Sequence, residues 1–166
     1  MRRQVSAALK VARSITRGHT TPAATVDLGI ERKGGVSFLG FVPQNMTVPR
    51  GSTVLFRMPA RSNEVHTATF GPGNPETEPN SYLGTIAGSL QSPQFDPRAL
   101  YPSDPPPAIV GFTTALHGNG FWSTGALDGD SRSATPPRSA VRFNSVGAFA
   151  YYCLIHPFMR GTITVT

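Results

Sequence analysis

The sequence predicts an all-β domain, of the sandwich or barrel type, with long connecting loops. Its 166 residues suit one domain and are few for two. Glycine (17) and proline (16) are too frequent for a helical bundle, whereas runs rich in valine, isoleucine and aromatic residues exclude a wholly disordered chain. Segments near both ends of the chain alternate apolar and polar residues with a period of two. Such alternation, punctuated by glycine and proline, is typical of a β-sandwich or barrel.

Residues 4–16 predict a basic amphipathic helix, because apolar side chains from Val5 to Ile15 recur at spacings of three and four. Residues 18–35 contain Pro22 and a Gly-Gly pair and are interpreted as a linker. We therefore predict a basic helix and linker over residues 1–33, followed by one folded domain over residues 34–166. The helix is expected to pack on this domain or to join it to an upstream one.

The charge distribution excludes several classes of protein. Residues 1–17 hold five basic side chains and no acidic one, so the net charge of +6 comes mainly from this end and the rest is nearly neutral. Without a basic stripe, no nucleic-acid binding is predicted. Because Lys10 and Arg13 interrupt the possible apolar core, no clear signal peptide is present. No apolar run reaches 18 residues, so no membrane span is predicted.

Six segments after residue 35 predict strands. In the last of them Ile163 and Val165 alternate with threonines, as expected of a half-buried strand. In the one before it, Tyr151 and Cys153 share a face, which predicts that the thiol points into the core. The six predicted strands cover residues 36–41, 52–58, 65–70, 140–143, 149–153 and 161–166.

The middle of the chain, about residues 71–138, differs from both ends. It holds eleven of the sixteen prolines, and only residues 109–113 predict a strand within it. Stretches of this length without regular structure are uncommon inside a compact domain. We therefore interpret the segment as a long Pro/Gly-rich insertion, either a functional elaboration or a mobile part.

One group of residues has side chains that can bind a metal ion. Cys153, His156 and Met159 follow one another at the spacing Cys-x2-His-x2-Met between two predicted strands. His66 lies on an earlier strand, and strand pairing in a sandwich can bring it alongside. Two imidazoles, a thiolate and a weak thioether suit copper in both of its oxidation states. Zinc also accepts cysteine and histidine, but a thioether ligand argues against it. The other interpretation is a buried cysteine and methionine with two unrelated histidines; the single cysteine excludes an intramolecular disulfide.

The segment Cys-Leu-Ile-His-Pro-Phe-Met, residues 153–159 and here named the Cys–Met loop, resembles that of cupredoxins, the plastocyanin and azurin family of blue copper proteins. Within that family it is most similar to the amicyanin loop, and residues 36–70 and 140–166 resemble the family's first and last strands. Two features depart from the family: Thr67 stands where many relatives have asparagine, and the insertion is longer. The resemblance implies a Greek-key β-sandwich with one copper ion, whose ligands are His66, Cys153, His156 and Met159.

The resemblance further implies a type 1 copper protein that carries single electrons and meets other redox proteins transiently, in the periplasm or outside the cell. Two alternatives remain open: copper capture or delivery without electron transfer, and a metal-free sandwich that serves as an interaction domain. No enzyme is predicted. Multicopper oxidases and copper nitrite reductases place histidine beside the copper cysteine, where this chain has Tyr152 and Leu154, and common hydrolase and phosphate-binding motifs are absent.

Two weaker signals concern the surroundings of the site. His117, in a His-Gly-Asn-Gly segment, is either a further group near the metal or, as we prefer, a solvated loop residue. The apolar residues around His156 form either a docking patch for a redox partner or ordinary core, and the sequence favours neither. These apolar residues are Leu154, Ile155, Pro157 and Phe158.

Overall fold

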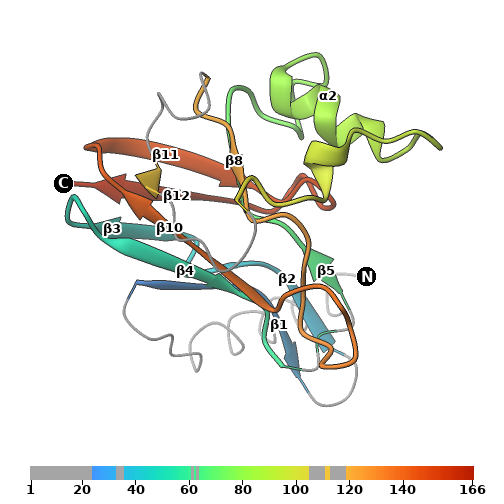
Figure 1. Cartoon of the computed structure of the whole chain (residues 1–166), viewed down its shortest axis with the longest axis horizontal. Helices are drawn as coiled ribbons and strands as arrows, with labels where there is room; N and C mark the ends of the chain where they lie inside the picture. Colours follow the sequence, from blue (N-terminus) through green and yellow to red (C-terminus); the bar gives the residue numbers. More distant parts are fainter. Residues whose placement is uncertain (1–23, 33–35, 61, 63, 105–110, 113–118) are drawn as a thin grey trace, which may run out of the picture.

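Two five-stranded sheets pack against each other in the computed structural model, which describes residues 24–32, 36–60, 62, 64–104, 111–112 and 119–166 (Figure 1). The first sheet has the strand order β2-β1-β4-β10-β7. Within it, β1 is antiparallel to β2 and parallel to β4, and β10 is antiparallel to β4 and parallel to β7. Its strands are β1 (Thr25–Arg32), β2 (Val36–Val42), β4 (Thr53–Arg57), β7 (Gly111–Phe112) and β10 (Arg138–Phe143).

The second sheet has the order β3-β12-β11-β6-β8, and here only β3 and β12 run parallel. A separate antiparallel ribbon pairs β5 (Val65–His66) with β9 (Leu127–Asp128). Mixed sheets built from strands distant in sequence confirm the predicted all-β sandwich. The strands of the second sheet are β3 (Asn45–Val48), β6 (Thr69–Phe70), β8 (Trp122–Ser123), β11 (Gly147–Tyr152) and β12 (Arg160–Val165).

The core lies between the two sheets, and the strand alternation predicts its members. Val54 and Phe56 of β4 are buried, as are Ile163 and Val165 of β12, whereas the threonines that alternate with the last two are partly exposed. Cys153, directly after β11, belongs to the same apolar cluster. The predicted inward direction of the thiol is confirmed, so any ion that it binds lies at one end of the sandwich core.

The interpretation of residues 18–35 as a linker is wrong for Thr25–Arg32, which forms β1 between β2 and β4. Its apolar residues alternate, but the Asp27 and Gly29 between them made the segment resemble a linker in the sequence. Asp27 is fully buried and paired with Arg57 of β4, and Gly29 adopts a positive φ of 77° where the β1–β2 register shifts. The folded domain therefore begins before residue 34. The helix predicted over residues 4–16 lies outside the described residues.

The middle segment holds more regular structure than the one strand that was predicted in it. It contributes β8 and β9 to the sheets, and it contains helix α2 (Tyr82–Ser89) and the 3-10 turn η1 (Pro97–Ala99). Gly84 within α2 made the helix difficult to predict from the sequence. The fold requires glycine at this position, because a Cβ there would lie 2.1 Å from the Glu78 carbonyl oxygen. We name residues 82–100 the helical lobe, which lies at one end of the sandwich in Figure 1. Of the predicted strand 109–113, the described part is Gly111–Phe112.

The helical lobe packs on the sandwich through a second apolar cluster. Leu83 and Ile86 of α2 are buried there against Leu154 of the Cys–Met loop. The lobe thus contacts the residue that follows Cys153 directly. Among the described residues, no helix has the length and apolar character that crossing a bilayer requires.

Candidate metal centre

Three of the four predicted residues converge on one point at the end of the sandwich. His66 ends β5, Cys153 follows β11, and His156 lies in the Cys–Met loop. The two imidazole Nδ1 atoms are 3.1 Å apart, and the Cys153 Sγ is 3.8 Å from the Nδ1 of His66 and 3.9 Å from that of His156. Side chains separated by 87 positions in the chain therefore present two nitrogens and one sulfur to a common centre.

Hydrogen bonds within the Cys–Met loop fix the direction of its side chains. The Cys153 N–H donates to the Met159 carbonyl at 3.1 Å, and the Met159 N–H donates to the His156 carbonyl at 2.8 Å. The His156 N–H donates to the Cys153 sulfur at 3.4 Å. This closed loop is short enough to hold an imidazole against the thiol that precedes it by three residues.

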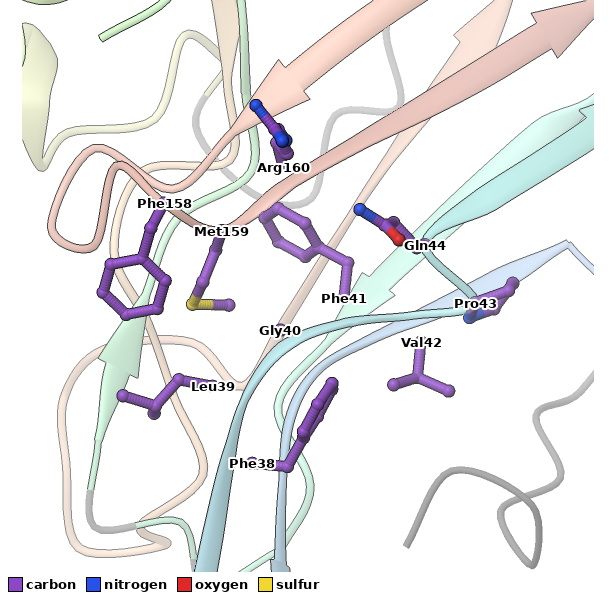
Figure 2. A pocket seen from close by; sticks show the side chains of 10 residues that line it. All are labelled: Phe38, Leu39, Gly40, Phe41, Val42, Pro43, Gln44, Phe158, Met159 and Arg160. Atoms are coloured by element: carbon purple, nitrogen blue, oxygen red, sulfur yellow. The ribbon is translucent and has the colours of Figure 1, made fainter. Parts of the chain in front are cut away.

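Met159, the fourth predicted residue, is buried in the same apolar cluster as Cys153. Figure 2 shows its side chain extending toward Leu39 and Phe158, at a pocket of about 520 Å³ that β2 and the end of the Cys–Met loop line together. Its assignment as the weak fourth ligand stays a prediction from the motif.

Burial sets the protonation of the two innermost groups. His66 is 1% exposed, and its burial, together with the nearby His156, lowers its pKa to about 4. Its ring is therefore neutral at neutral pH, the state in which a ring nitrogen can bind a metal. Burial also raises the pKa of the Cys153 thiol, while N–H groups of Thr67 and His156 aimed at the sulfur oppose that rise. A metal ion that binds here displaces the thiol proton.

The donor set and its spacing fit one metal ion. Metal–nitrogen bonds of about 2.0 Å and metal–sulfur bonds of about 2.3 Å let a single ion touch two donors up to about 4 Å apart. All three separations, 3.1, 3.8 and 3.9 Å, satisfy this limit. Two imidazoles with one thiolate in a trigonal set are the ligands of blue copper sites. The three residues therefore form a cluster that can hold one copper ion.

Thr67 joins the segment that contains His66 to the Cys–Met loop through hydrogen bonds. The sequence did not reveal this role. Its N–H donates to the Cys153 sulfur at 3.4 Å, and its Oγ1 accepts the Leu154 N–H at 2.9 Å. Both bonds are buried and join segments that are 86 and 87 positions apart. The threonine hydroxyl thus joins the two segments by a hydrogen bond directly after the first histidine.

We expect Thr67→Val to lower the free energy of unfolding by about 1–3 kcal/mol, because valine keeps the shape but leaves the buried Leu154 N–H without an acceptor. Urea unfolding of the metal-free protein measures this change. Thr67→Ser retains the hydroxyl and is the matched control. Equal losses in the two variants would contradict a role for the hydroxyl, since serine lacks only the methyl group.

The far side of His66 rests on β1, the strand that sequence reasoning missed. The His66 Nε2 is buried and has no hydrogen-bond partner among the described residues. A Cβ on Gly29 would lie 3.1 Å from this nitrogen, so the absence of a side chain at Gly29 makes room for the imidazole. The only sequence signal was a glycine inside an alternating apolar pattern.

The apolar residues around His156 that the sequence analysis named lie partly in the core and partly at the surface. Leu154 is buried, Ile155 and Pro157 are partly exposed, and Phe158 is 51% exposed. The His156 side chain retains 21% of its exposure, so its edge reaches solvent beside Phe158. His117 lies outside the described residues, and its suggested role stays untested.

Comparison with known proteins finds similarity to solved structures only. No profile of a known protein family matches the chain, and no curated protein matches it. An oxidised plastocyanin from Dryopteris crassirhizoma is 22% identical, with a TM-score of 0.44, over 86% of this chain and 99% of the plastocyanin. An amicyanin from Paracoccus versutus is 19% identical (TM-score 0.45) over 88% of this chain and 85% of its own. A purple cupredoxin from Nitrosopumilus maritimus is 15% identical (TM-score 0.42) over 86% and 98%.

Proposed function

We propose that this chain is a cupredoxin that holds one copper ion with His66, Cys153 and His156 and carries single electrons between other proteins. The meeting of two imidazole Nδ1 atoms and one buried sulfur within 3.1 to 3.9 Å supports this proposal most strongly. The Cys–Met loop motif adds Met159 as a weak fourth ligand. A location outside the cytoplasm, periplasmic or extracellular, is part of the proposal on the same resemblance.

Bound copper supplies the one-electron couple, and the chain supplies a rigid and dry setting for it. The Thr67 N–H donates to the Cys153 sulfur, and the Cys153 backbone N–H donates to the Met159 carbonyl, so little rearrangement is available to the sulfur. Burial of His66 and Cys153 excludes water from the thiolate side. A site that changes little between oxidation states exchanges electrons with a low reorganisation cost.

His156 gives the electron its route to a partner. It is the one residue of the three whose ring edge reaches solvent, and the exposed Phe158 lies beside it with ring centroids 5.9 Å apart. A redox protein that covers this edge comes into contact with a copper ligand without opening the fold. Transient contact of this kind suits a carrier that must release each partner after transfer.

Copper titration of the metal-free protein, followed by voltammetry, tests the function. We expect an intense visible band from thiolate-to-copper charge transfer and a reversible one-electron wave. A visible band without reversible cycling would instead favour copper capture or delivery. No spectral change, together with no effect of copper on thermal stability, would favour an interaction domain without metal.

A further inference from the structure

A carboxylate faces the outer edge of His156. Glu64 lies two positions before His66, and its Oε2 is 3.9 Å from the His156 Nε2. The backbone at this point is fixed by Ser62, which is buried and whose Oγ accepts the Glu64 N–H at 3.2 Å. Glu64 itself is 43% exposed, so its side chain reaches the ring edge from the surface.

The two nitrogens of His156 therefore have different surroundings. Its Nδ1 faces the His66 Nδ1 and the Cys153 sulfur, and its Nε2 faces the Glu64 carboxylate. A neutral imidazole carries one proton, and an ionised carboxylate only accepts hydrogen bonds. A proton on Nε2 is favoured by the carboxylate and leaves the Nδ1 lone pair free for a metal ion.

His66 lacks such a partner. Within the described part of the chain, nothing hydrogen-bonds to its Nε2, which lies in dry surroundings next to Gly29. The surroundings of the two imidazoles thus differ: His66 is buried, whereas His156 faces a negatively charged group at the surface. This asymmetry distinguishes Glu64 from an ordinary surface acid.

We propose that Glu64 is a positioning residue for the metal centre: it holds His156 in the Nε2–H form, and its charge favours the oxidised state of bound copper. The inference rests on the proposed function. A negative charge near the ion stabilises the more positive oxidation state. The carboxylate thereby lowers the reduction potential and makes the chain a better electron donor than it would be with a neutral residue at this position.

Glu64→Gln tests the charge because glutamine keeps the size and the oxygen acceptor. We expect the one-electron equilibrium constant for reduction to rise about threefold to tenfold, a tenfold change being about 59 mV in midpoint potential. The visible band should stay, because no candidate ligand changes. The difference from wild type should shrink as salt is raised from about 0.01 to 1 M, because screening weakens an exposed charge.

Two further variants separate this effect from a general structural one. Glu64→Asp keeps the charge and should stay closer to the wild-type potential than Glu64→Gln does. Glu78→Gln is the matched control, because Glu78 is an exposed carboxylate that accepts the Asn74 N–H at 3.1 Å and faces no candidate ligand. The potential of this control should change less than that of Glu64→Gln.

The metal-free protein gives an independent readout. Nitrogen-15 NMR of the His156 ring should find the neutral wild-type ring protonated mainly at Nε2, and Glu64→Ala should raise the Nδ1–H fraction several-fold. If Glu64→Gln leaves the potential of a blue, reversibly cycling protein unchanged, or shifts it no more than Glu78→Gln does, the role of Glu64 is overturned and the proposed function stands. If wild type shows neither band nor cycling, both are overturned.

Discussion

Replacing Cys153 with serine should remove the intense visible absorption of the copper-loaded protein, with a fall of more than about tenfold in extinction. The band requires a thiolate that donates charge to copper, and a serine hydroxyl does not ionise at neutral pH to replace it. Absorption spectra of wild type and variant at equal protein and copper concentrations measure the change.

Folding of this variant needs a separate check. Cys153 is fully buried, and a serine hydroxyl there costs about 1–3 kcal/mol if it finds no partner. Far-ultraviolet circular dichroism should therefore show a sandwich that is less stable but still folded. A folded variant with the same coloured spectrum as wild type would contradict the assignment of the sulfur as a ligand.

Copper should stabilise the wild-type protein strongly. The His66 Nδ1 and the Cys153 sulfur come from residues 87 positions apart, so the three-donor set exists only in the folded state. Free copper at about a thousand times the dissociation constant should raise the free energy of unfolding by about 4 kcal/mol. For a domain of this size, that corresponds to roughly 10 °C in Tm. Thermal unfolding with and without copper, under reducing anaerobic conditions, measures it.

His66→Leu is the informative variant for this experiment, because leucine fills most of the buried volume without offering a donor. We expect most of the copper-dependent stabilisation to be lost in it. Stabilisation equal to that of wild type would show that copper binds somewhere other than at the convergence of the three side chains.

The candidate metal centre was accessible to sequence reasoning because most of it is local. Cys153, His156 and Met159 occupy one short loop between two strands, where spacing alone brings side chains together. His66 was accessible because residues 65–70 predict a strand, which the structure divides into β5 and β6. Regular alternation revealed β4, β11 and β12, whose buried residues are aliphatic, aromatic or glycine.

The missed elements depend on contacts with residues outside the elements themselves. β1 contains the buried Asp27, with which Arg57 of β4 pairs across 30 positions. α2 contains Gly84, whose backbone approaches Glu78 too closely for a side chain. In both cases a tertiary contact overrides the local propensity. Local patterns therefore pointed to a linker and an irregular insertion.

The supporting residues of the site were hidden for the same reason. The sequence gives no sign of the contacts that Thr67 and Glu64 make, because the fold alone places them against the Cys–Met loop. Their contacts to Leu154 and His156 are visible only in the fold. Sequence spacing identifies candidate ligands, whereas the groups that orient those ligands emerge from the packing of distant strands.

Copper K-edge X-ray absorption of the copper-loaded protein tests the central claim most directly, because it reports which atoms surround the ion. We expect two nitrogen scatterers at about 2.0 Å and one sulfur scatterer at about 2.2–2.3 Å. A copper environment of nitrogen and oxygen only, with no sulfur at bonding distance, would contradict a metal centre built from His66, Cys153 and His156.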